Sequence, residues 1–404
     1  MNTIMPSLSQ TTEATSEKSK RGLIIAVLLF ILFTLSVILE QVIKPTDGAA
    51  MLLTVLKKSS VYALVAVSMN LLNGFTGLFS LGQAGFMLLG AYTYAIFTIP
   101  VADRAFVYQY YDCIVNFSFP EALGSVMGSF GVLLGIFFSL ILAGLVAAGV
   151  AWLIGLPVLK LKSDYLAIAT LGFAEIIRAV FQWGKLGSVT NAANPLKNYV
   201  RLSFFQFTVG GITINLSTFM ALLIASACIG IIVMLVNSSY GRAFKAIRED
   251  EIAAEAMGIS LYRHKQLAFC ISSFFAGVGG ALLAMFTNTV QANNFKSSMT
   301  YEILLIVVLG GIGSISGSCI GAILFIFSSE WWLRGLDSGN FLGLSAPLIF
   351  RNGFRLVVFS LVIMVVVLFF RKGLMGDKEL PYVVSQFRER FAHRRRQKAG
   401  ASDD

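Results

Sequence analysis

Long runs of apolar residues recur along the chain, separated by short polar or glycine-rich segments. A membrane-crossing α-helix needs about 20 apolar residues, or about 17 at the least. By that measure the pattern predicts ten spans, which we place near 22–39, 54–73, 82–99, 130–157, 164–183, 212–236, 266–288, 301–313, 316–334 and 354–371. The segment 301–313 is too short to cross a bilayer alone. The expected fold class is all-α, in a polytopic integral membrane protein.

The composition excludes an ordinary soluble protein. Hydrophobic residues make up 56% of 404 positions and charged residues only 13%, whereas soluble domains are about 25% charged. A globule of this length could not bury so much apolar surface. The cysteines lack C-x-x-C spacing, so they indicate neither a disulfide framework nor a metal site; they are Cys113, Cys228, Cys270 and Cys319.

The chain divides into three parts. Residues 1–21 form a polar tail that we expect in the cytoplasm, 22–371 the membrane domain, and 372–404 a basic cytoplasmic tail. A signal peptide also has charges followed by an apolar run, as here at 22–39. No small-x-small cleavage site follows in residues 40–44, so we favour an uncleaved anchor.

The net charge of +10 raises the question of nucleic acid. The positive residues collect at the ends of apolar runs instead of on one face, which is typical of a topology signal. If both termini are cytoplasmic, Lys and Arg are in excess on the cytoplasmic side of the membrane. We therefore expect a multi-pass protein with both termini inside and no nucleic-acid partner.

Two glycine-rich stretches, 73–85 and 310–322, interrupt the helical pattern. Non-helical backbone at membrane depth must be buried in protein or line a wet cavity, and broken helices often mark transport sites. Close helix packing is the alternative. We favour packing for Gly313, Gly317 and Gly321, spaced i, i+4 and i+8. For the first stretch both interpretations stay open, and its pathway candidates are Asn73, Thr76, Ser80 and Gln83.

Two charges fall inside the span 164–183. Glu175 and Arg178 are spaced i, i+3 on one helix face, where they can pair. Charges within a span are costly and are functional candidates by default. We keep both as translocation-pathway candidates, with a structural ion pair as the simpler and favoured interpretation.

The polar segment 240–260 lies between two long spans and contains helix-forming residues up to Gly258. Its apolar positions suit a short helix that presents a face to a cytoplasmic partner; they are Ile247, Ile252, Ala256 and Ile259. A solvated connector is the alternative. The small-residue run 253–256 and the glycine that ends the helix argue against it.

Catalytic motifs are absent from the sequence. A phosphate-binding loop needs an upstream glycine and a closing Lys followed by Ser or Thr, but Gly184-Lys185 is followed by Leu186. The two histidines, His264 and His393, form no metal motif. We expect no enzymatic activity and no cofactor in this chain.

The run 251–258 resembles the E-A-A…G coupling segment of ABC importer permeases, which docks into ATP-binding subunits. The resemblance implies an ATPase-coupling role for Glu251, Ala253, Ala254, Glu255, Ala256 and Gly258. The stretches 68–77, 80–86, 90–92, 164–173 and 308–314 are similar to the branched-chain amino acid permeases, of the LivM type more than the LivH type. The similarity extends over about 60–370.

This resemblance implies an ABC importer permease fold in a bacterial inner membrane. It also implies an extracytoplasmic binding protein that delivers small apolar amino acids, a LivH-like second permease, and two LivG/LivF-like subunits that bind the ATP. A urea or short-amide importer is an alternative, because the turn 190–195 and the outer loop 100–123 depart from the family pattern. We also keep two rival functions: a secondary transporter or channel, which would need charged relays inside spans, and a membrane scaffold.

Overall fold

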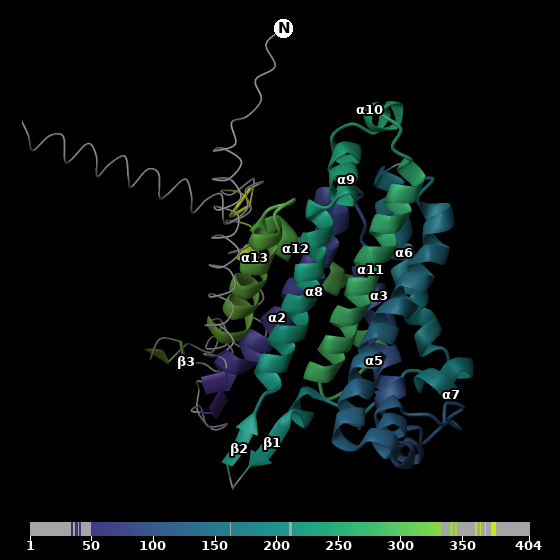
Figure 1. Cartoon of the computed structure of the whole chain (residues 1–404), viewed down its shortest axis with the longest axis vertical. Coiled ribbons are helices and arrows are strands. Elements are labelled where there is room, and N and C mark those ends of the chain that lie inside the picture. The colour runs from purple at the N-terminus through teal and green to yellow at the C-terminus, as the bar shows by residue number, and fades with distance from the viewer. Residues whose placement is uncertain are drawn as a thin grey trace, which may run out of the picture.

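A computed structural model describes residues 50–161, 163–209 and 212–332, with single positions between 34 and 41 and short pieces between 340 and 376. This part of the chain is mainly helical (Figure 1). The longer helices are α2 (Ala50–Asn70), α3 (Gln83–Thr98), α5 (Phe119–Val158), α6 (Ser163–Gln182), α8 (Ser217–Asn237), α9 (Ser239–Glu249), α11 (Leu261–Phe286), α12 (Ser297–Gly310) and α13 (Ile315–Phe327). Shorter elements are α4 (Arg104–Val107), α7 (Gly187–Thr190), α10 (Glu251–Ala256), two π-helices (Leu71–Phe75 and Ser328–Trp332) and the strands β1 (Gln206–Val209), β2 (Ile212–Asn215), β3 (Asn340–Phe341) and β4 (Leu344–Ser345).

Five of the described helices are long and apolar enough to cross a membrane, or up to seven spans if each bent helix pair counts as one. This supports a polytopic membrane protein, whereas the predicted count of ten is not confirmed. The predicted spans 22–39 and 354–371 lie almost entirely outside the described residues.

The helices α2 and α11 form the centre of the molecule and contact one another. On one side α11 packs against α3 and α5, and α6 covers α3. On the other side α2 packs against α8, α12 and α13 (Figure 1). The central pair carries residues with almost no exposed surface, such as Leu64 and Leu282, because other helices cover it on several faces.

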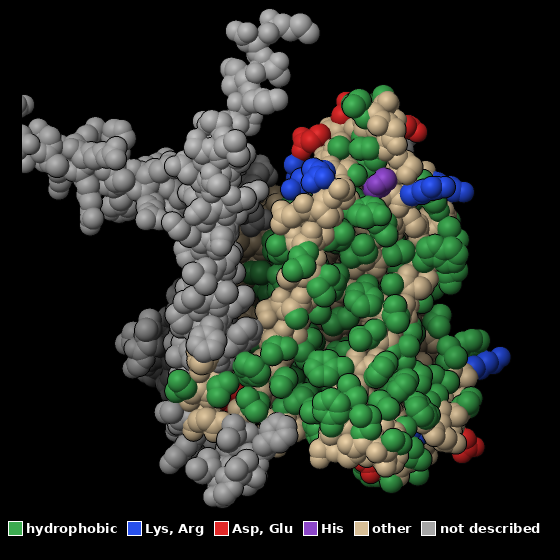
Figure 2. All heavy atoms as spheres, in the orientation of Figure 1, with side chains coloured by type: hydrophobic (Ala, Val, Ile, Leu, Met, Phe, Trp, Pro, Cys, Tyr) green, Lys and Arg blue, Asp and Glu red, His purple; other side chains and the backbone are tan. Residues whose placement is uncertain are grey.

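The bundle has two distinct ends. We call the end that carries α9 and α10 the α10 end, and the opposite end, with β1, β2 and α7, the hairpin end (Figure 1). Figure 2 shows apolar side chains covering the middle of the visible face, while most of the visible charged side chains gather at the α10 end. An apolar band of this kind is what a bilayer requires of a lipid-facing surface.

The structure corrects the prediction that 212–236 is one helix. Residues 212–215 form β2, which pairs antiparallel with β1 in the register Gln206↔Asn215 to Val209↔Ile212, and the helix begins only at Ser217. Three consecutive β-branched residues in 212–214 suit a strand. Hydropathy alone did not separate this apolar strand from the helix that follows it.

The predicted separate spans 301–313 and 316–334 are not confirmed. The helices α12 and α13, with the π-helix extending the latter, form a pair bent by 120° at a short turn. Gly311 and Gly313 occupy this turn with φ of 118° and 89°, a region that L side chains avoid and glycine enters freely. The chain therefore reverses within a few residues, and neither helix is a long span.

Two further predicted spans keep their place and change shape. The helix at 82–99 is α3, which reaches span length only together with Val101–Val107, across a bend of 103°. The predicted 130–157 corresponds to the part of α5 that follows a sharp break at Gly128 (φ 61°). The residues before this break fold back onto the helix, because Gly131 and Gly135 have no side chains to keep Leu123 and Pro120 away.

Candidate functional site

The first glycine-rich stretch forms an irregular break directly after α2. Its first turn is the π-helix Leu71–Phe75, and the backbone then stays non-helical until α3 begins at Gln83. Gly77 has a φ of 74°. Single π-helical turns are frequent at functional sites, so this break is a candidate moving part.

The four polar residues predicted in this break hold its shape. Asn73 and Ser80 bond to each other, Oδ1 of Asn73 accepting from the Ser80 amide at 3.1 Å. The Thr76 hydroxyl donates to the Leu71 carbonyl at 3.0 Å, and Nε2 of Gln83 donates to the Ser68 hydroxyl at 2.7 Å. Thr76, Ser80 and Gln83 are buried. Their part in translocation remains a prediction.

The second glycine-rich stretch combines a turn with a packing face. Gly317 and Gly321 lie against α12, where a Cβ would come within 2.3 Å of the Gly310 carbonyl and 2.7 Å of the Ile306 carbonyl, respectively. Gly313 is in the preceding turn and not in α13. The packing face on α13 therefore contains two of the three predicted glycines, and Gly313 makes a different contact.

Gly313 contacts Asn70, which is the last residue of α2 and is completely buried. Its Oδ1 accepts from the Gly313 amide at 2.8 Å, and its Nδ2 donates to the Ser314 carbonyl at 2.9 Å and to the Ser318 hydroxyl at 2.8 Å. One side chain thus joins the two breaks, and Asn70 and Gly313 are 243 residues apart in sequence. Sequence reasoning missed Asn70, although an Asn at the end of an apolar span is itself a signal.

The predicted partner segment at the α10 end is a short, firmly capped helix. Oδ1 of Asp250 caps α10 by accepting from the amides of Ile252 and Ala253 at 2.8 and 3.1 Å. At the other end Gly258 has a φ of 85°, and the amides of 258 and 259 return to the carbonyls of Glu255 and Ala254. This is the Schellman arrangement, which satisfies the last carbonyls of a helix.

Not all of the predicted coupling residues on α10 are exposed to a partner. Ala254 is buried, at 4% exposure, where α10 meets α9 and α11, so its side chain is not available to a partner. The exposed apolar side chains are Ile252 and Met257, each 83% exposed. Glu251 pairs with Lys265 of α11 at 2.6 Å. The remaining predicted coupling residues, Ala253, Glu255 and Ala256, are exposed.

Helix α9 connects this exposed unit to the first break. Nη1 of Arg248 donates to the Gly74 carbonyl at 2.9 Å, and Nζ of Lys245 lies 5.5 Å from the centre of the Phe75 ring. The backbone and stem of Arg248 also occupy the space beside Gly77, where a Cβ would meet them at 3.0 to 3.4 Å. The segment 240–260 is therefore in direct contact with the break after α2, and α9 was predicted only as part of a partner surface.

The charges within α6 form an ion pair. Oε2 of Glu175 lies 2.7 Å from Nη2 of Arg178, as their spacing predicts. Oε1 of Glu175 accepts from the amide and hydroxyl of Ser297, the first residue of α12. This pair therefore links α6 to the start of the bent pair, and whether it acts in transport stays a prediction.

The two segments that depart from the family pattern meet at the hairpin end. Nδ2 of Asn191 donates to the Val107 carbonyl at 3.0 Å. Arg104 is buried and holds the loop by donating to the carbonyls of Ile96, Ile99, Val115 and Phe117. The described residues contain no cluster of His, Cys, Asp and Glu that could hold a metal ion.

Comparisons with known proteins find a family that matches most of the chain. The family described as "Branched-chain amino acid transport system / permease component" matches residues 51–370. The chain is 33% identical to the "High-affinity branched-chain amino acid transport system permease protein LivM" of Salmonella typhimurium and of Escherichia coli K12, over 67% of this chain and 61% of each relative. It therefore covers less than two thirds of the length of these relatives.

A more distant relative is named LivH, the name of the second type of permease. The chain is 26% identical to the "Probable branched-chain amino acid transport permease protein LivH" of Methanocaldococcus jannaschii, over 57% of this chain and 70% of the relative. No solved structure matches the chain.

Proposed function

The chain belongs to the branched-chain amino acid permease family, and from that premise we propose that it is the permease subunit of an ATP-driven importer. The substrate is a branched-chain or other small apolar amino acid, which an extracytoplasmic binding protein delivers. The chain has no ATPase site of its own, so the energy comes from partner subunits.

The observation that carries this proposal is the contact between the α9–α10 segment and the break after α2. An importer whose ATPases are separate chains needs a rigid exposed element that transmits their movement into the membrane helices. The capped helix α10 supplies such an element, and the bond from Arg248 to the Gly74 carbonyl supplies its connection. A secondary transporter would have no need for either.

We propose the following mechanical sequence. ATPase subunits bind the exposed side of α10 around Ile252 and Met257 and move α9 as they close. Arg248 displaces the π-helical turn at Gly74, and Asn70 passes the displacement to the turn at Gly313. Coupling requires an element with two arrangements that both sites bias, and two adjacent irregular breaks can supply one. The pathway then opens alternately to each side.

The orientation and the remaining partners follow from this assignment. The α10 end faces the cytoplasm of an inner membrane, together with both termini, and the hairpin end faces the binding protein. A LivH-like subunit completes the permease, since relatives with that name also match the chain. Polar tails at 1–21 and 372–404 flank the membrane domain on the cytoplasmic side.

The test is reconstitution in liposomes with a LivH-like permease and two ATPases that are encoded with this chain. We expect uptake of radiolabelled leucine that requires ATP on the side of the ATPases and the binding protein on the opposite side. Liposomes without the ATPases are the control. Leucine uptake driven by a proton or sodium gradient in that control would overturn the importer assignment in favour of a secondary transporter.

A further inference from the structure

A cavity of about 400 Å³ opens at the hairpin end, between α2, the start of α8, the hairpin and the end of α11. Small-molecule sites in proteins typically measure about 300–1,000 Å³, so this one suits a small ligand. Neither sequence reasoning nor the comparisons assign any role to it. The residues of its lining come from five separate segments, which only the tertiary structure brings together.

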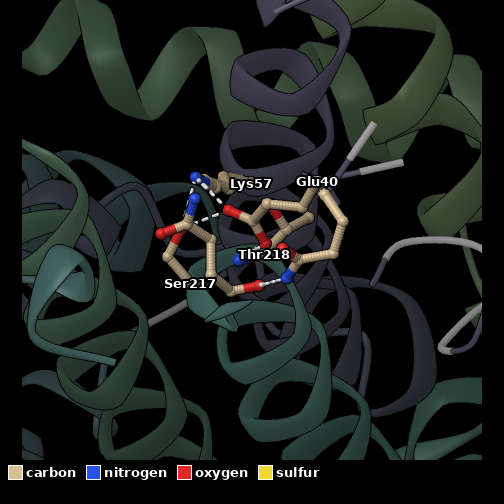
Figure 3. A network of polar contacts seen from close by, with 6 residues as sticks. Glu40, Lys57, Ser217 and Thr218 are labelled. Carbon is tan, nitrogen blue, oxygen red and sulfur yellow. Dashed lines mark hydrogen bonds and ion pairs between the residues drawn. The ribbon is translucent and has the colours of Figure 1, made fainter. Parts of the chain in front are cut away.

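One wall of the cavity carries a network of charges around Glu40. Figure 3 shows Lys57 of α2 and Ser217 and Thr218 of α8 converging on this carboxylate. Oε1 accepts from the Ser217 hydroxyl at 2.5 Å and lies 3.1 Å from Nζ of Lys57, and Oε2 accepts from the Thr218 amide at 2.9 Å. The Glu40 side chain is only 6% exposed. Removing charges from water at this depth is costly, and such charges in membrane proteins usually serve a function.

A second cation, Arg201, also lines the cavity. Nη1 of Arg201 donates to Oδ1 of Asn288 at 2.9 Å, and both residues line the cavity. The remaining donors of the guanidinium fit a carboxylate, which Arg binds through two parallel hydrogen bonds. The apolar part of the lining consists of Leu53, Leu202, Met285 and Phe286.

We propose that this cavity binds a free zwitterionic amino acid with an apolar side chain, on the side where the binding protein releases it. The ligand carboxylate pairs with Arg201 beside Asn288, its ammonium shares the Glu40 carboxylate with Lys57, and its side chain contacts Phe286. This inference rests on the proposed function for the sidedness of the cavity and for the amino-acid class. It adds the place on the permease where the substrate is held.

The chemistry of the lining distinguishes the substrate classes that the sequence left open. Urea and short amides are neutral, and their binding would gain little from a guanidinium and a carboxylate in one cavity. A fatty acid or another simple anion would use Arg201 but has no ammonium group to share the Glu40 carboxylate with Lys57. Only a ligand with both charges and an apolar part uses all three surfaces.

The direct test is binding of radiolabelled leucine to the purified permease pair in lipid nanodiscs, without the binding protein. We expect Arg201→Gln to weaken leucine binding at least tenfold, and Arg201→Lys to recover part of the loss because it keeps the charge. Excess unlabelled leucine should displace the label, whereas leucinamide, isocaproate and urea should displace it poorly. Lys185→Gln is the matched control, because this residue is a basic side chain at the same end and outside the cavity.

A second variant protects the test against misfolding. Asn288 is exposed, so Asn288→Asp should fold normally and place a negative charge beside the ligand carboxylate. It should weaken leucine binding while it leaves leucinamide binding, measured with labelled leucinamide at high concentration, unchanged or stronger. Equal leucine affinity in the wild type, Arg201→Gln and Asn288→Asp proteins would overturn the site, as would efficient displacement by urea.

The two proposals fail in different ways. If the full importer takes up leucine at the wild-type rate with Arg201→Gln and with Asn288→Asp, the importer function stands and the cavity is not the substrate site. If the wild-type importer takes up no branched-chain amino acid under any energy source, the proposed function fails. The nanodisc measurement then still decides whether the cavity binds a zwitterion.

Discussion

The Arg248 guanidinium donates to the Gly74 carbonyl across 174 residues of sequence, at 2.9 Å. This bond joins a helix outside the apolar band to the π-helical turn at the end of the central helix α2. A hydrogen bond to a charged group contributes about 1.5–3 kcal/mol, so the contact is strong enough to bias two arrangements of the break. It is the basis of the first prediction.

Replacing Arg248 with Ala should uncouple the transporter without disassembling it. Uptake and substrate-stimulated ATP hydrolysis should fall together, about tenfold or more, because a loss of about 1.5 kcal/mol corresponds to that factor. The ATPases should still co-purify, since the surface of α10 is intact. Arg242→Ala is the matched control, because this residue is also on α9 and its side-chain bond within the described part of the chain is local, to Ser239. Equal losses in both variants would contradict the specific role of Arg248.

The exposed apolar pair on α10 should determine ATPase binding. Ile252→Ser together with Met257→Ser should reduce co-purification of the ATPase subunits, because both side chains are 83% exposed and suit a partner's apolar groove. Leu161→Ser, at an exposed apolar position in a different loop at the same end, should have no effect. Normal ATPase recovery with the double variant would show that the partner binds elsewhere.

The packing of α12 on α13 should not tolerate a side chain at position 317. A Cβ there would lie 2.3 Å from the Gly310 carbonyl, so Gly317→Leu must separate the two helices. Overpacking typically costs about 1–3 kcal/mol, and here backbone is the obstacle. We expect a lower thermal midpoint and less monodisperse protein. Gly230→Leu is the control, because no atom of the described residues lies within 4 Å of its Cβ position. A Gly317→Leu protein that is stable but inactive would favour a pathway role.

Removing the amide of Asn70 should loosen the joint between the two breaks. Asn70→Leu leaves the Gly313 amide without its present partner, and a buried orphan costs about 1–3 kcal/mol. The Ser314 carbonyl keeps its bonds from the Ser318 amide and hydroxyl. The thermal midpoint should fall well below that of Asn237→Ala, which among the described residues loses an exposed bond to Val233. Similar midpoints for the two variants would mean that water or a backbone shift replaces the Asn70 bonds.

Cysteine labelling tests the orientation. In a background without the four native cysteines, Asp112→Cys at the hairpin end should react with an impermeant reagent in intact cells. Ser260→Cys at the α10 end should react only after the membrane is opened. Both positions are exposed in the structure, so accessibility reports the side of the membrane. The reverse pattern would place α10 outside and would contradict ATPase coupling.

Hydropathy by itself determined the class of this protein and the positions of five long helices. The reason is that a bilayer imposes about 20 consecutive apolar residues on each span, whatever the neighbouring helices do. The spacing of Glu175 and Arg178 likewise predicted their ion pair, since residues three apart share one face of any helix. The polar helical segment at 240–260 could be recognised because its terminating Gly258 is a local signal. Its division into α9 and α10 at the cap Asp250 was not predicted.

Contacts between distant segments were decided only by the tertiary structure. No local pattern could show that Ala254 is buried, that Asn70 reaches Gly313, or that Arg248 reaches Gly74, because each depends on how helices cross. The cavity could not be predicted from the sequence for the same reason, because Glu40, Lys57 and Arg201 come from three separate segments. In the sequence the two basic residues contributed only to the charge bias that predicts the topology. Spacing along the chain predicts what one helix does, whereas a binding site depends on side chains that packing brings together.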